Sequence, residues 1–125
     1  MGEVKSCSIP ILREFFIRSA EIRRTSQTLD AARKMLEAMD TSLYDITDLK
    51  NSVNTMEEDI KKTQTWMREK QLEVERLIEE IASVEARSYA RLHYLNGLQW
   101  CEVAQLSRMK EDAVKKRVYR ELQKK

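Results

Sequence analysis

Apolar side chains recur at heptad spacing along the first half of the chain. The first row and its intermediate positions are Ile22, Leu29, Leu36 and Leu43, with Ala32, Met39 and Ile46. Such a and d positions are typical of a helix that packs along one narrow stripe against another helix. Upstream, apolar residues continue with helical spacing from Ile11 to Ala20. We therefore expect a first helix over about residues 10–40, with Pro10 in its first turn.

A second heptad row follows in a shifted phase. Its members are Val53, Ile60, Met67, Val74 and Ile81, with Met56, Leu77 and Val84 at the partner positions. Thr63 and Lys70 interrupt the partner row with polar side chains. Residues 40–48, between the two rows, are rich in Asp, Thr and Ser, which favour turns and helix starts. The pattern predicts a break within 40–48 and a second helix over about 47–86.

The length of the second helix bears on assembly. At 1.5 Å per residue it would extend roughly 60 Å, and a helix cannot cover its own apolar stripe. An antiparallel hairpin with the first helix would cover only part of it. We therefore expect a homo-oligomer, a dimer or larger, held by a coiled-coil stalk.

Composition agrees with an all-α fold. Only 2 Gly and 1 Pro occur in 125 residues, too few for the turns of a β fold. Charged residues make up 35% and aromatic residues 6%, which suits long exposed helices. No apolar run reaches the roughly 18 residues that a membrane span needs, so we expect no membrane partner. Cys7 and Cys101 lie far apart, and we interpret them as reduced thiols of an intracellular protein.

The net charge of +2 conceals an asymmetry. Residues 84–125 contain ten Lys and Arg against five acidic residues, an excess of five positive charges. The first 83 residues therefore carry a net charge of −3. This distribution indicates a polyanionic partner for the C-terminal part of the chain.

After Val84 the heptad spacing ends and shorter helices are expected. Asn96-Gly97 suits a helix C-terminus, because it accepts a left-handed backbone. A short helix over about 99–106, a turn at 107–109 and a last helix over about 110–122 follow. The residues expected to face inward are Val103, Ala104, Met109, Ala113, Val114, Val118 and Leu122. This order is the helix-turn-helix plan, in which the last helix enters the major groove of DNA.

The candidate DNA-binding residues lie in this turn and along the last helix. They are Arg108, Lys110, Glu111, Asp112, Lys115, Lys116, Arg117, Tyr119 and Arg120. We expect Glu111, Lys115 and Tyr119 to lie opposite the core, with Asp112 and Lys116 beside them. Lysines can donate to guanine edges, and acidic side chains can accept from cytosine. Arg108, Arg117 and Arg120 are better placed for phosphates. Tyr119 has two interpretations, a phosphate contact or a cover for Trp100.

Residues 92–122 resemble region 4 of bacterial sigma factors, the part that reads a promoter element. The resemblance is carried by Leu92-x-Tyr94-Leu95-x-Gly97-Leu98-x-Trp100-x-Glu102-Val103-Ala104 and by Val114-Lys115-x-Arg117-Val118-x-Arg120. With its preceding long helices, the chain resembles the RinA/ArpU-type phage and prophage regulators of Gram-positive bacteria. The resemblance implies a DNA-binding transcriptional regulator of phage late genes, in the cytoplasm of a bacterial host. If it extends to mechanism, RNA polymerase is a further partner.

Three positions depart from the region-4 motif. Arg108 stands where the turn usually has Gly, Ser107 replaces a usual Leu, and Lys110 replaces the usual Ser at the start of the recognition helix. Each change weakens the local turn chemistry and leaves open a degenerate motif used for protein contact. Two further alternatives are a DNA-packaging subunit that resembles phage small terminases and a coiled-coil adaptor that does not bind DNA.

The sequence offers little for catalysis. It has no Gly-rich phosphate loop and no zinc-ligand spacing, and His93 is its only histidine. No His or Asp partner lies near Cys101 in sequence. We expect no enzyme, no catalytic or metal-binding residue and no cofactor. The expected domains are a helical oligomerisation region over 1–86 and a DNA-binding domain over 87–125.

Overall fold

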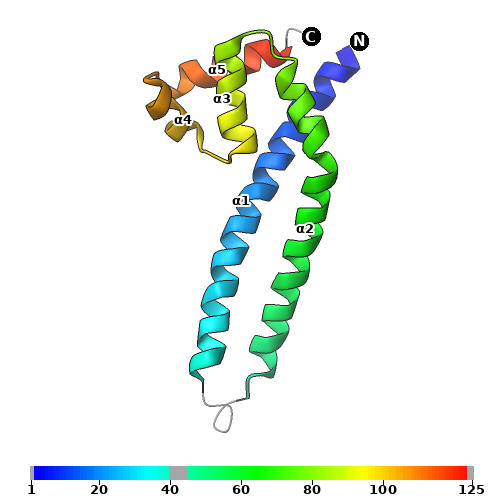
Figure 1. Ribbon diagram of the computed structural model, residues 1–125, viewed down its shortest axis with the longest axis vertical. Coiled ribbons are helices and arrows are strands. Elements are labelled where there is room, and N and C mark those ends of the chain that lie inside the picture. Colours follow the sequence, from blue (N-terminus) through cyan, green and yellow to red (C-terminus); the bar gives the residue numbers. More distant parts are fainter. Residues whose placement is uncertain (1, 40–44, 124–125) are drawn as a thin grey trace. The chain divides into compact units, whose positions relative to one another are not determined.

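The computed structural model describes residues 2–39 and 45–123, with side chains from Ile9 onward. Its helices are α1 (Gly2–Ala38), α2 (Thr47–Glu79), α3 (Val84–Ala90), the π-helical turn η1 (Arg91–Leu95), α4 (Trp100–Ser107) and α5 (Glu111–Gln123) (Figure 1). No strand occurs among these residues. The predicted all-α class is therefore confirmed.

The chain divides into two compact units. Residues 1–17 and 69–125 form one unit, and residues 18–68 form the other. Each of the two long helices contributes to both units. The domain border predicted between residues 86 and 87 falls inside α3, and the predicted division into an oligomerisation region and a DNA-binding domain stays a prediction.

Within residues 18–68, α1 and α2 form an antiparallel hairpin (Figure 1). Their heptad positions meet in a core that consists of Leu29, Ala32 and Val53 with Leu36, Leu49, Met56 and Ile60 around it. Across the two helices Arg33 Nη2 donates to Glu57 Oε1 at 2.7 Å. This ion pair is half exposed, so it adds little stability beside the apolar contacts.

The break between the long helices lies where the polar segment predicted it. Helix α1 ends at Ala38 and α2 begins at Thr47, whose amide donates to Asp45 Oδ1 at 3.0 Å. Residues 40–44, Leu43 among them, lie outside the described residues. The expected start of the first helix is wrong: α1 begins at Gly2 and contains Pro10 in its interior. A proline removes one helical hydrogen bond, and here the helix continues on both sides of that loss.

The second helix is shorter than expected. Helix α2 ends at Glu79, not near residue 86. Ser83 ends the intervening turn and caps α3, because its Oγ accepts from Ala86 N at 3.3 Å. The heptad count also fails locally: Val84 is 70% exposed, whereas Ile78, outside the count, is fully buried. The Ser83 hydroxyl explains the end of α2, because it gives the backbone a local hydrogen bond that competes with a continuing helix.

The second heptad row is covered within a single chain to a larger extent than expected. Val53, Val74 and Ile81 are buried, and Ile60 and Met67 are half buried. Self-association was expected because an apolar stripe was thought to be uncovered. Since one chain buries most of this stripe by itself, the stripe gives little support for self-association. The homo-oligomer stays a prediction.

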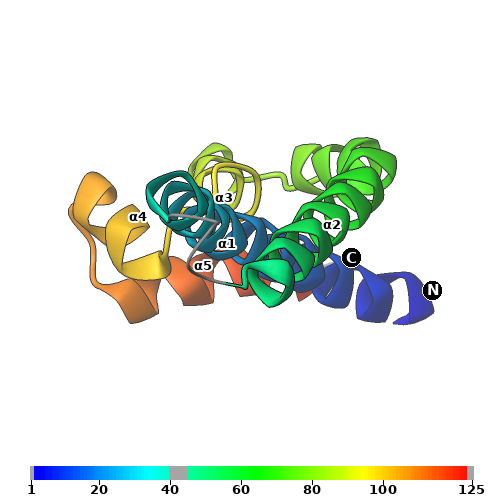
Figure 2. The same cartoon turned by 90° about the horizontal axis from the view of Figure 1, so that it is seen from below.

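The short helices pack around α5. Both α3 and α4 contact α5, and α4 also contacts η1 (Figure 1, Figure 2). The long helices supply Leu12, Phe15, Val74 and Ile78 to the buried residues of this unit. Ala86, Ala90 and Ala104 are buried as well, and their small side chains allow helices to approach closely. The expected inward position of Val103 and Ala104 is confirmed.

The turn between α4 and α5 depends on a left-handed residue. Arg108 has φ 57° and ψ 39°, and it is the one non-glycine residue of the described ranges with a positive φ. Its amide caps the last turn of α4, and Met109 N donates to Ala104 O at 3.0 Å. The left-handed backbone at this position favours glycine, and the sequence has arginine there.

We expect Arg108→Gly to raise the free energy of unfolding by about 1 kcal/mol, because glycine removes the steric cost of the left-handed backbone. Urea unfolding followed by circular dichroism measures this difference. Arg108→Ala is the matched control: it removes the same charge but keeps the Cβ atom, so it should bring no such gain. Equal effects of the two changes would contradict the steric explanation.

Candidate functional site

The buried stripe of α5 determines which of its side chains reach solvent. Val114 and Val118 are fully buried and Leu122 nearly so. At roughly 100° per residue, the direction opposite Val118 passes midway between Lys116 and Arg120. The exposed residues of the helix are Glu111, Asp112, Ala113, Lys116, Arg117, Arg120 and Gln123.

This rotation corrects two expectations from the sequence. Ala113 is exposed, although it was expected to face inward. Lys115 and Tyr119 are half buried at the side of the helix, although they were expected to lie opposite the core. Both errors come from giving Ala113 the same weight as the valines. A methyl group contributes little to burial, so the larger Val118 and Leu122 determine the rotation.

The cations of the candidate site differ in their partners. Lys115 Nζ lies 3.4 Å from Glu111 Oε1, one turn earlier on α5. Arg117 pairs with Glu85 of α3. The other basic residues, which form no ion pair within the described part of the chain, are Arg108, Lys110, Lys116 and Arg120. Four of the six predicted cations therefore keep their charge available to an anion.

Acidic residues restrict where that anion can bind. Glu111 and Asp112 occupy the first turn of α5. They stabilise the positive end of the helix dipole and repel an anion at that end. The cations in the middle of the helix are thus the better contacts for a polyanion.

A stack of aromatic rings lies beneath α5. The His93 ring is stacked between Phe16 and Trp100, with centroid distances of 4.0 and 3.8 Å and interplanar angles of 17° and 15°. Tyr119 of α5 meets Trp100 edge to face at 6.1 Å. We call Phe16, His93, Trp100 and Tyr119 the ring column. Trp100 packs in the core, since the residue is only 8% exposed.

The ring column accounts for the position of Tyr119. Its ring covers Trp100, as one of the two interpretations of the sequence proposed. The part played by His93 was missed. Nothing in the sequence relates His93 to Phe16, because 77 positions separate them and neither belongs to a recognisable motif.

Backbone geometry holds the His93 ring in place. The π-helical turn η1 and the left-handed Gly97, with φ 76°, turn the chain back so that Leu98 O lies 2.6 Å from His93 Nδ1. The carbonyl can only accept, so Nδ1 carries the proton and donates. Burial, with a smaller effect of the Lys115 charge, lowers the pKa of His93 to about 4 despite this hydrogen bond. The stacked ring is therefore neutral at physiological pH.

Over the described ranges, no three His, Cys, Asp or Glu side chains lie close enough together to hold a metal ion. Cys101 is an exposed free thiol, and the side chain of Cys7 lies outside the described residues. None of the helices in the described residues is long and apolar enough to cross a membrane.

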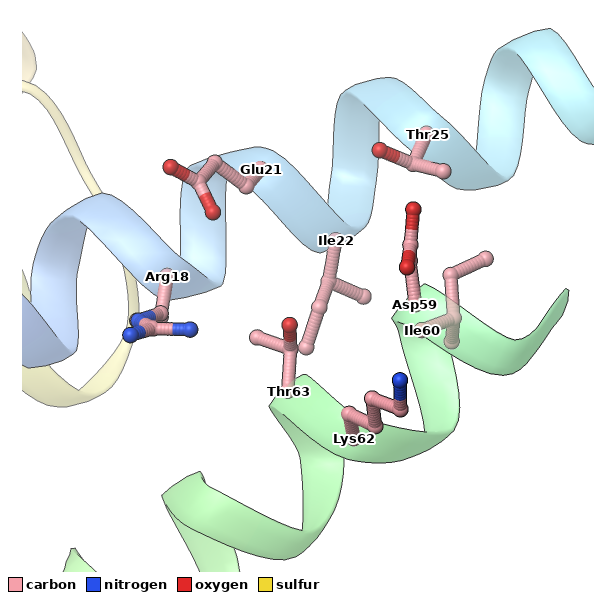
Figure 3. Close-up of a pocket in the computed structure, with 8 residues that line it drawn as sticks. All are labelled: Arg18, Glu21, Ile22, Thr25, Asp59, Ile60, Lys62 and Thr63. Atoms are coloured by element: carbon pink, nitrogen blue, oxygen red, sulfur yellow. The ribbon is translucent and has the colours of Figure 1, made fainter. Parts of the chain in front are cut away.

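A groove of about 360 Å³ lies between α1 and α2 in the unit 18–68 (Figure 3). It is lined by Arg18, Glu21, Ile22, Thr25, Asp59, Ile60, Lys62 and Thr63. Two cations and two carboxylates balance each other there, so the groove favours no ionic ligand. The Arg18 guanidinium also lies 5.1 Å from the centroid of the Trp66 ring. Thr63 interrupts the apolar row at this point, and we interpret the groove as incomplete packing.

No protein-family model matches the chain, and neither the curated proteins nor the solved structures that were searched include a match. The resemblance to sigma region 4 and to RinA/ArpU-type regulators therefore stays a prediction from the sequence.

We expect Thr63→Ile to stabilise the hairpin by about 1 kcal/mol, because the larger apolar side chain fills part of the groove. Within the described residues the Thr63 hydroxyl makes no hydrogen bond that would be lost. Thermal unfolding should show a Tm higher by a few degrees. The control is Thr65→Ile, at an exposed position whose hydroxyl donates to Lys61 O at 2.9 Å. An equal gain there would contradict the packing explanation.

The neutral state of His93 predicts a pH dependence of stability. The unfolded ring has the ordinary pKa of 6.5 and the folded ring a pKa of about 4. The unfolded state thus gains a proton first as the pH falls. Stability is complete above pH 6.5 and declines between 6.5 and 4, by about 2 kcal/mol at pH 5. His93→Phe keeps an aromatic ring without a titrating group, so urea unfolding at pH 7.5 and 5 should show a smaller loss. Parallel losses in the two proteins would refute this explanation.

Proposed function

We propose that this protein binds double-stranded DNA through the exposed face of α5 and acts as a transcriptional regulator at a promoter. One observation carries the proposal. Lys116 and Arg120 lie one turn apart at the centre of that face, and neither has an ion-pair partner within the described residues. They belong to a segment, 84–125, with an excess of five positive charges.

The dimensions and chemistry of α5 support this proposal. Its 13 residues extend roughly 20 Å, and the major groove admits such a helix. Lys116 and Arg120 can donate to guanine edges, and Asp112 can accept from cytosine. Arg108 and Lys110, in and after the turn, can hold phosphates and so set the position of the helix. Arg120 thereby changes from an expected phosphate contact to a candidate for reading bases.

The remaining predicted DNA contacts carry less weight. Lys115 and Arg117 already have acidic partners, so a phosphate would have to compete with Glu111 and Glu85. Tyr119 is engaged with the Trp100 ring, and its hydroxyl is hydrogen-bonded with that of the buried Tyr94. Contact with RNA polymerase, a bacterial host cytoplasm and homo-oligomerisation belong to the same proposal and depend on the sequence resemblance alone.

The experiment begins with a duplex selected from a random pool by the full-length protein, since the DNA site is unknown. We expect Lys116→Ala and Arg120→Ala each to weaken binding to the selected duplex by about 1–3 kcal/mol and to relax the sequence preference. Lys115→Ala is the matched control: it removes the same charge from a neighbouring, half-buried and paired lysine, and should cost less. Fluorescence anisotropy at several salt concentrations measures both affinity and salt slope, about 0.9 per phosphate contact.

The same measurements separate the alternatives. An absence of duplex binding even at low salt would overturn the proposal and favour an adaptor that does not bind DNA. A large ring in light scattering, with binding that ignores sequence, would favour a packaging subunit instead. A larger loss for Lys115→Ala than for Lys116→Ala and Arg120→Ala would show that another face of α5 meets the DNA.

A further inference from the structure

We propose that Phe16 of α1 is a positioning residue for α5, acting through the stacked rings of His93 and Trp100. The proposal rests on the proposed function only for its DNA-binding readout. It assigns to the N-terminal helix a part in a site whose predicted contacts all lie within residues 108–120.

Phe16 of α1 is in direct contact with the His93 ring. The Phe16 and His93 rings are stacked with their centroids 4.0 Å apart and their planes within 17°. Leu12 is fully buried and Phe15 is 4% exposed, so this part of α1 is packed into the unit that also contains the short helices. Phe16 therefore approaches His93 from a helix that is itself held in place.

The His93 ring is held by a hydrogen bond and by a ring on each face. One edge of its ring is held by the hydrogen bond to Leu98 O, and its two faces are covered by Phe16 and Trp100. Its exposed fraction is only 5%. Phe16 is thus the residue that completes the stack on the side away from Trp100.

Trp100 connects the stacked rings to α5 through its contact with Tyr119. Trp100 is the first residue of α4, and its ring meets Tyr119 of α5 edge to face at 6.1 Å. Tyr119 precedes Arg120 directly and lies three residues after Lys116. A shift of the Trp100 ring would therefore displace the side of α5 next to Lys116 and Arg120. Because packed rings leave little free volume, the loss of the Phe16 ring shifts the other rings of the ring column.

The test uses the full-length protein with Trp66→Phe, so that Trp100 is its single tryptophan. Phe16→Leu keeps an apolar side chain but removes the ring, and Phe16→Tyr restores a ring. The control is Ile17→Ala, at the adjacent residue, which is 40% exposed. We expect Phe16→Leu to raise the pKa of His93 toward its ordinary value in NMR titrations, because one face of the ring loses its cover. The emission of Trp100 should also change.

Duplex binding gives the third readout. Phe16→Leu should weaken binding to the selected duplex by about tenfold, with little change in the salt slope, because it displaces cations without removing any. Phe16→Tyr should recover most of the affinity, and Ile17→Ala should leave it unchanged. The proposal is overturned if Phe16→Leu leaves the His93 titration and Trp100 emission unaltered, or if Ile17→Ala has the same effects.

Two outcomes keep the proposal and the proposed function distinguishable. If the unsubstituted protein binds no duplex, the DNA-binding function fails, while the His93 and Trp100 readouts still test the positioning. If Phe16→Leu does not fold, the test moves to the unsubstituted protein. Nuclear Overhauser contacts between the Phe16 and His93 rings must then be present, and their absence overturns the proposal.

Discussion

The stacking of a neutral imidazole between two aromatic rings joins three elements of the unit formed by residues 1–17 and 69–125. His93 contributes from η1, Phe16 from α1 and Trp100 from the start of α4. The stack favours the uncharged ring, since an imidazolium buried between apolar faces would lose its hydration. The one N–H group of the neutral ring, at Nδ1, donates to the carbonyl of Leu98.

That arrangement requires an irregular backbone around the ring. A regular α-helix from Val84 onward would place the chain after Leu95 elsewhere, whereas the wider turn η1 and the positive φ of Gly97 bring Leu98 back to His93. The start of α4 then follows at once, supported by Glu102, whose carboxylate accepts from Gln99 N at 2.9 Å. Local irregularity and the packing of Trp100 are therefore parts of one structural solution.

On the surface of the short helices, some cations form ion pairs and others form none within the described residues. Arg117 forms an ion pair with Glu85, Lys115 with Glu111, and Arg91 with Glu79. These exposed pairs contribute little to stability, yet they decide which cations remain available. Lys116 and Arg120 form no ion pair within the described residues, although Asp112 lies one turn before Lys116 on the same exposed face.

The sequence by itself determined the class of the fold, the break between the long helices and the order of the short helices near the C-terminus. These features follow from local rules: heptad spacing, polar turn residues and Asn96-Gly97 each act within a few residues. The sequence also indicated Val114, Val118 and Leu122 as the buried stripe of α5. It did not determine the end of α2 at Glu79, because a continuing helix and a Ser83 cap are both locally acceptable. Only the tertiary structure decided the rotation of α5, the pairing of Arg117 with Glu85, and the meeting of Phe16 with His93. Each of these depends on contacts between residues distant in sequence, and their energies arise from burial and from charge separation in space, which spacing along the chain does not encode.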